Sequence, residues 1–196
     1  MNATTIALGR GLAALRRGAL LAVLCLIGSA PALAIDYKIV TASPRGTYIE
    51  IGRDLARFVA PAVDIQLESL PSAGSAENVK RLRYEPGVKF ALVQSDVYQA
   101  YVDLAAAGNR EARGLISPLR LIMPLYNEEI YFVARSDAPF DHVHQIRDQR
   151  IGMGPLGSGT ALTSATLYRA LFGTGVADDK ARFLTNEEAL SALVTD

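Results

Sequence analysis

Four short segments combine hydroxyl, amide and glycine residues at points where a predicted strand gives way to a predicted helix. They are residues 43–48, 72–75, 94–96 and 157–160. The first main-chain N–H groups of a helix have no partner within the helix, and the positive end of the helix dipole lies there. Several such helix starts around one point would hold a carboxylate or another anion without an ion pair.

The candidate ligand-binding residues come from three of these segments. They are Ser43, Arg45, Thr47, Tyr48, Gln94, Ser95, Asp96, Gly157, Ser158, Gly159 and Thr160. A second interpretation stays open, because Ser, Thr and Gly are common at helix starts for structural reasons alone. The glycine-rich residues 152–160 favour a ligand more than the other segments do, because a short helix cap does not require so many glycines.

Residues 152–157 also match the G-x-G-x-x-G pattern of dinucleotide-binding loops, between a predicted strand and a predicted helix. In that fold an acidic residue near the end of the next strand binds the ribose. Asp178 and Asp179 precede the next predicted strand instead. A phosphate-binding P-loop is excluded, because no lysine follows Gly159.

Other catalytic and metal-binding patterns are weak. His142 and His144 are the only histidines, and their polar surroundings fit a solvated loop better than a metal site. The acidic pairs at residues 128–129 and 187–188 are adjacent, so their side chains diverge on a strand or a helix. No Ser/His/Asp arrangement includes a recognisable nucleophile elbow. We therefore expect a protein that is not an enzyme, with no catalytic residue, metal or cofactor.

Composition narrows the possible partners. Half of the 196 residues are apolar by type, and 20 lysines and arginines balance 20 aspartates and glutamates. Without a basic excess, the chain is not expected to bind nucleic acid. The predicted partner, from the helix starts described above, is a small anionic solute.

The first 34 residues differ from the rest of the chain. They contain no acidic residue, place three arginines before an apolar run at residues 18–28, and end in Ala32-Leu33-Ala34. This pattern is typical of a signal peptide, with cleavage expected after Ala34 and export through either the Sec or the Tat route. Cleavage there would remove Cys25, the only cysteine, so no disulfide is expected in the mature protein.

Hydrophobic periodicity and turn residues predict an alternation of strands and helices after residue 34. Strands are expected at residues 37–41, 63–70, 88–93, 119–126, 129–134, 150–153 and 181–184. Helices are expected at residues 47–60, 75–84, 95–107, 160–172 and 186–194. Residues 108–114 are expected to form a polar loop, and Ser75 to cap the second helix. Such alternation predicts an α/β fold with mostly parallel sheets, whose ligands bind at the carboxyl ends of the strands.

Several blocks, in this order, resemble the TAXI group of extracytoplasmic solute receptors of TRAP transporters. They are residues 40–48 with Ile51-Gly52, residues 72–78, residues 91–96, Leu125-Tyr126 leading into residues 130–135, and residues 151–160. The block Ala91-Leu92-Val93-Gln94-Ser95-Asp96 carries the resemblance furthest. Together the blocks extend over nearly all of the chain after residue 34.

The resemblance implies a periplasmic-binding-protein fold of type II, with two lobes that close on a small carboxylate or amino acid. Residues 35–128 would form the first lobe, and residues 129–196 the crossover strand and the start of the second. The implied location is the periplasm, and the implied partners are TRAP membrane permease subunits. An alternative of the same fold is a secreted sensor that signals to a membrane kinase.

The chain departs from the family pattern at two points. Arg45 stands where the family has another glycine, and its cation would either strengthen anion binding or point into solvent. Family members also continue beyond the helix predicted at residues 186–194. The second lobe is therefore expected to be incomplete, and we expect the 196-residue form to bind its ligand weakly or to fold poorly.

Overall fold

Three parallel strands form the sheet of the N-terminal half in the computed structural model, which describes residues 35–195. The strands are β1 (Ile35–Val40), β2 (Ile65–Leu70) and β3 (Val88–Ala91), in the order β2-β1-β3. β1 is therefore central, and its pairing with β2 runs from Ile35 opposite Ile65 to Val40 opposite Leu70. The predicted signal peptide lies outside the described residues.

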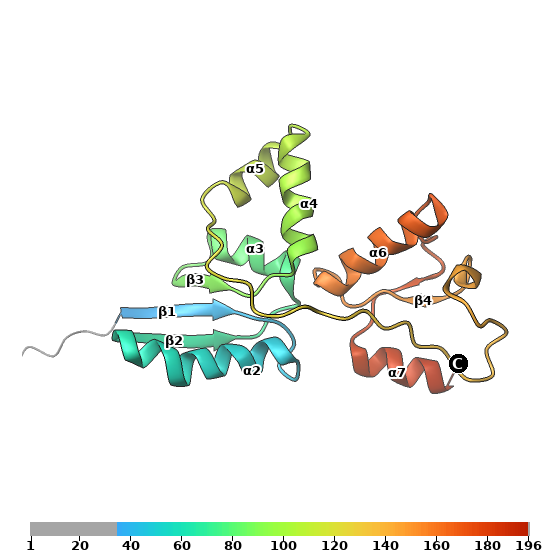
Figure 1. The fold of residues 1–196 in the computed structure, drawn as a ribbon, viewed down its shortest axis with the longest axis horizontal. Coiled ribbons are helices and arrows are strands. Elements are labelled where there is room, and N and C mark those ends of the chain that lie inside the picture. Colours follow the sequence, from blue (N-terminus) through green and yellow to red (C-terminus); the bar gives the residue numbers. More distant parts are fainter. Residues whose placement is uncertain (1–34, 196) are drawn as a thin grey trace, which may run out of the picture. The chain divides into compact units, whose positions relative to one another are not determined.

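The helices that follow β1 and β2 lie on opposite faces of this sheet (Figure 1). They are α2 (Thr47–Asp54) and α3 (Ser75–Tyr84). From β1 the chain crosses to β2 at one edge of the sheet, and from β2 it returns past β1 to β3 at the other edge. Connections between parallel strands are right-handed, so these two connecting helices must cover opposite faces of the sheet. α2 continues through a π-helical turn and a 3₁₀ turn that ends at Val63, where Pro61 prevents a longer helix.

Several elements of the N-terminal half each contribute a fully buried side chain to its core. These are Val40, Ile49, Val79, Val88, Val97 and Leu115. Val97 lies on α4 (Ser95–Ala106), and Leu115 lies on α5 (Arg110–Ile116). Burying one such aliphatic side chain stabilises the fold by about 1.5–3 kcal/mol.

The polar loop predicted at residues 108–114 is wrong, because α5 occupies most of this segment. The Asn109 side chain accepts a hydrogen bond from the Ala112 N–H at 2.9 Å and so caps the helix. Ala112 and Leu115 are buried, and α5 packs against α4. Tertiary packing thus overrides the two glycines on which the loop prediction rested.

The C-terminal part contains a second, two-stranded parallel sheet. Its strands are β4 (Ile151–Gly152) and β5 (Ala181–Arg182), and its helices are α6 (Gly159–Phe172) and α7 (Asn186–Thr195). Ser158 caps α6 by accepting a hydrogen bond from the Ala161 N–H at 3.0 Å. Gly173, at a φ of 72°, ends α6 in the left-handed conformation that glycine adopts readily. The parallel sheets confirm the predicted α/β class.

The strands predicted at residues 119–126 and 129–134 are wrong. No residue of either segment pairs in a sheet with another of the described residues 35–195. The apolar side chains of these segments are exposed, Leu121 at 85% and Val133 at 71%. Alternating apolar residues predict a strand only where a neighbouring backbone accepts the ladder hydrogen bonds, and periodicity does not show that neighbour.

Candidate ligand-binding site

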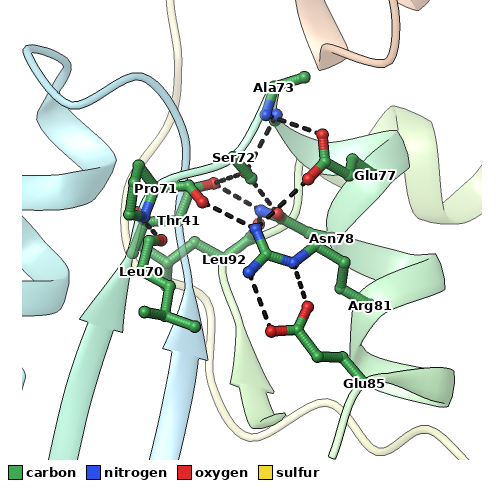
Figure 2. Close-up of polar contacts among 11 residues, drawn as sticks. Thr41, Leu70, Pro71, Ser72, Ala73, Glu77, Asn78, Arg81, Glu85 and Leu92 are labelled. Atoms are coloured by element: carbon green, nitrogen blue, oxygen red, sulfur yellow. Dashed lines mark hydrogen bonds and ion pairs between the residues drawn. The ribbon is translucent and has the colours of Figure 1, made fainter.

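The Asn78 side chain joins the carboxyl ends of β1 and β3 (Figure 2). Its Nδ2 donates to the carbonyl oxygens of Thr41 and Leu92, the latter at 2.7 Å. The Ser72 hydroxyl donates to Asn78 Oδ1 at 2.6 Å, and the Thr41 hydroxyl donates to the Leu70 carbonyl at 2.8 Å. Because Asn78 is completely buried, this network fixes the ends of all three strands relative to one another.

This junction is the topological switch point of the sheet. β1 and β3 are neighbours, but the chain leaves β1 through α2 and leaves β3 through α4. α2 lies on one face of the sheet, and α4 lies with α3 on the other (Figure 1). In open parallel sheets, ligands bind in the crevice outside such a point.

A second set of polar contacts holds the loop before α3 (Figure 2). Glu77 Oε2 accepts a hydrogen bond from the Ala73 N–H at 3.0 Å, and Arg81 Nη1 donates to the Pro71 carbonyl at 2.7 Å. Arg81 also pairs with Glu85, with 2.5 Å between Nε and Oε2. The hydrogen bond between them raises the pKa of Arg81 and lowers the pKa of Glu85. The loop that leads into α3 is therefore held in one conformation.

The N-termini of α3, α4 and α6 meet just beyond this loop. Ser75 does not cap α3 as predicted, because Gly74 takes the cap position, and the Ser75 hydroxyl accepts from the Gln94 N–H at 3.0 Å. The Gly157 carbonyl accepts from the Glu77 N–H at 3.1 Å, which joins the loop before α6 to α3. Gly74 has a φ of 129°, and a Cβ atom there would lie 3.1 Å from Ser158 Cα.

Tyr48 and Gln94, both predicted from the sequence, lie beside Glu128, which was not predicted as a ligand-binding residue. Glu128 Oε2 accepts a hydrogen bond from Gln94 Nε2 at 2.5 Å, and its Oε1 accepts from the Tyr126 hydroxyl at 3.4 Å. The rings of Tyr48 and Tyr126 meet edge to face, with 6.5 Å between centroids. Burial first, and then a hydrogen bond to Glu128, raise the pKa of Tyr48 far above its ordinary value. Tyr48 therefore remains a neutral donor at physiological pH.

Three further predicted residues have structural partners at this junction. Asp96 Oδ1 accepts from the Val97 N–H at 2.8 Å, and its other oxygen accepts from the Thr163 hydroxyl on α6. The Ser158 hydroxyl is used as a helix cap and also donates to the Pro155 carbonyl at 2.6 Å. Gly157 has a φ of 82°, and its carbonyl meets α3. Of the two interpretations of Ser158, a ligand contact or a helix cap, its hydroxyl therefore fits the second.

The remaining predicted residues lie nearer the surface. Arg45 forms an ion pair with Glu187 of α7 at 3.3 Å, with 75% of its side chain exposed. Ser43 makes the turn before α2, where its hydroxyl accepts from the Arg45 N–H at 3.4 Å. Thr47, Ser95 and Thr160 are exposed residues in the first turns of their helices. At these three helix starts, the groups that could bind a ligand are the main-chain N–H groups rather than the side chains.

Neither a metal-binding cluster nor a membrane-spanning helix occurs among the described residues. Within residues 35–195, no group of three or more His, Cys, Asp or Glu side chains is arranged to hold a metal ion. Over the same residues, no helix combines the length and hydropathy needed to cross a membrane. A surface hollow of about 340 Å³ lies elsewhere, between β3 and residues 118–122, and contains none of the predicted site residues.

Residues 39–195 match the NMT1-like family, over about four fifths of the chain. The chain belongs to the NMT1-like family. This is a periplasmic-binding-like family, which agrees with the parallel α/β sheets described above. An NMT1-like protein is in general a substrate-binding protein that takes a small solute. The helix N-termini that meet beside Tyr48 and Gln94 are the candidate site for that role.

Sequence reasoning missed Glu128 and Tyr126 because it treated residues 128–129 only as a possible acid/base pair. The signal available was the position of Tyr126-Asn127-Glu128 between the two apolar segments that resemble the family crossover. The resemblance implies that this segment connects the two lobes that would close on the ligand. An acidic residue there was a candidate on position alone.

Proposed function

We propose that this protein is an extracytoplasmic receptor that captures a small carboxylate or amino acid for a TRAP-type secondary importer. The observation that supports this is the meeting of the α3, α4 and α6 N-termini beside Tyr48 and Gln94. This meeting point lies outside the switch point that Asn78 holds. A ligand carboxylate would accept hydrogen bonds from first-turn main-chain N–H groups, while the Tyr48 hydroxyl donates to Glu128.

Such a site binds its ligand without turnover. Tyr48 keeps its proton because its pKa is raised, so it donates a hydrogen bond but does not act as a base. Gln94 and the main-chain amides are not titratable, and the hydroxyl of Ser158 is committed to capping α6. The Glu128 carboxylate accepts hydrogen bonds from Gln94 and Tyr126, and we assign it to ligand recognition, so the proposed role is binding and release.

Contacts between the two halves of the chain would complete the site around the ligand. Glu77 on α3 donates its N–H to Gly157 before α6, and Asp96 on α4 accepts from Thr163 on α6. We propose that these contacts form when the two halves close around the ligand, because each contact joins the start of one helix to the start of another. The membrane permease would then recognise the closed form.

Native mass spectrometry of the exported protein tests this proposal. We expect a mature chain that begins at Ile35 and that carries one small acid when candidate acids are supplied in excess. Co-purification with TRAP permease subunits, and ligand uptake driven by an ion gradient, are expected in reconstituted vesicles. A partner kinase in place of a permease would favour the sensor alternative. Absence of any bound acid, or turnover of the acid, would contradict the receptor assignment.

A further inference from the structure

We propose that Glu128 receives the ammonium group of a zwitterionic ligand, so that the site takes α-amino acids in preference to plain carboxylates. This inference rests on the proposed receptor function and specifies its substrate class. It gives Glu128 the role of a specificity-determining residue. The argument uses the contacts of its carboxylate and the charges around it.

The Glu128 carboxylate is held by residues from separate parts of the chain. Gln94, the residue before α4, donates to one oxygen at 2.5 Å, and Tyr126 donates to the other at 3.4 Å. Tyr48 on α2 interacts with the same carboxylate, and that interaction contributes to its raised pKa. Although Glu128 is an exposed residue, its carboxylate lies against two of the predicted ligand-binding side chains.

The groups that contact Glu128 are all neutral. They are one amide and two phenols, and the ion pairs formed among residues 35–195 include none to Glu128. By contrast, Arg45, Arg81 and Arg135 each have a carboxylate partner. An ionised carboxylate can accept about four hydrogen bonds, and these contacts involve three donors. The carboxylate therefore has an acceptor position left for a charged N–H donor.

Charges of opposite sign therefore lie side by side in the site. The α3, α4 and α6 N-termini present positive dipole ends, and the Glu128 carboxylate is negative. An α-amino acid carries a carboxylate and an ammonium on adjacent atoms, which matches this arrangement. A plain carboxylate would bring a second negative charge close to Glu128 and would be disfavoured.

Calorimetric titration of the full chain with a panel of amino acids, each paired with the acid that lacks its amino group, tests this inference. L-glutamate is paired with glutarate, and L-alanine with propionate. In the wild type, the best amino acid is expected to bind about ten- to a hundredfold more tightly than its partner acid. Glu128→Gln is expected to remove that preference by weakening the amino acid while leaving the partner acid equal or tighter.

Glu129→Gln is the matched control, because it makes the same charge change at the next residue. Glu129 contacts Tyr131 rather than the site. It is expected to keep the wild-type preference, and a thermal melt confirms that both variants are folded. Acid binding without a preference for the amino acid, or a preference that survives Glu128→Gln, would overturn this inference alone. Failure of the wild type to bind any acid would overturn both this inference and the receptor function.

Discussion

The Gln94 side chain lies directly over the α-carbon of Gly159, in the space that any larger residue at position 159 would need. A Cβ atom on Gly159 would fall 1.2 Å from Gln94 Oε1 and 3.1 Å from Ser75 Oγ. Glycine at the first residue of α6 thus allows the start of that helix to approach the start of α4. In this position Gln94 also donates a hydrogen bond to Glu128, at 2.5 Å.

Gly159→Ala is therefore expected to displace the Gln94 side chain and break its hydrogen bond to Glu128. We expect ligand affinity to fall at least about tenfold, whereas the unfolding free energy is expected to change by less than about 1 kcal/mol, because the end of the flexible Gln94 side chain can move aside. Calorimetric titration and urea denaturation measure the two effects. Gly175→Ala is the control, because a Cβ atom there meets nothing within 4 Å. Equal affinities for the two variants would show that the contact between Gln94 and Gly159 is unimportant.

Asn78→Ala is expected to lower the unfolding free energy by about 2–4 kcal/mol. The substitution removes the donor to the carbonyl groups of Thr41 and Leu92, and leaves the Ser72 hydroxyl only its longer contact with the Thr41 carbonyl, at 3.2 Å. Urea denaturation monitored by circular dichroism gives the change. The comparison variant is Asn109→Ala, which removes only the cap of α5 and is expected to cost about 1 kcal/mol. A smaller loss at Asn78 than at Asn109 would mean that the network does not hold the strand ends.

Alanine substitutions at Gly52 and Gly114 are expected to change stability in opposite directions. A Cβ atom on Gly52 would lie 2.5 Å from Ser69 Oγ and 2.6 Å from Thr41 Cγ2, so Gly52→Ala separates α2 from the sheet. The expected loss is about 1–3 kcal/mol. A Cβ atom on Gly114 would meet nothing within 4 Å, so Gly114→Ala gains up to about 1 kcal/mol from helix propensity. Thermal melts of both variants check the two signs.

Tyr48 is expected to make stability depend on pH in alkaline solution. Burial and Glu128 raise the pKa of Tyr48 in the folded protein, whereas an unfolded tyrosine releases its proton near pH 10. The folded state then holds a proton that the unfolded state has lost, so the stabilisation is complete below about pH 10 and declines above it. Since Tyr48 is partly exposed, solvent screening keeps the decline below about 1.4 kcal/mol per pH unit.

Urea denaturation between about pH 9 and pH 11 separates this effect from that of the other tyrosines. Tyr48→Phe is expected to give a shallower decline than the wild type over that range. The pKa values of Tyr101 and Tyr126 are also raised, but both residues remain in each protein, so the difference between the two declines comes mainly from Tyr48. Parallel declines would mean that Tyr48 is not held as a neutral donor by Glu128.

Local sequence patterns predicted the elements that carry their own start and stop residues. The helix expected at residues 75–84 is α3 with the same bounds, since Pro71–Gly74 precede it and Glu85-Pro86-Gly87 follow it. The three strands of the first sheet and the glycine-rich loop before α6 were also predicted. In each case the information lies within a few residues of the element.

Patterns failed where a distant partner decides the structure. Residues 119–134 have the alternation of strands, but none of the described residues provides a ladder for them. Residues 110–116 form a helix because Ala112 and Leu115 are buried, in an element that packs against α4. Glu128 becomes part of the site only because the chain carries it to Gln94, 34 residues away in sequence. Spacing alone does not show such contacts.

Amide chemical shifts measured during a ligand titration test the central claim most directly. The proposed site consists of main-chain N–H groups at helix starts, so NMR spectra of the ¹⁵N-labelled full chain report on it without mutation. Titration with the tightest-binding acid is expected to produce the largest shifts at the amides of Ser75, Ser95 and Gly159. Shifts confined to the hollow between β3 and residues 118–122, or no shifts at these three amides at saturation, would contradict the account.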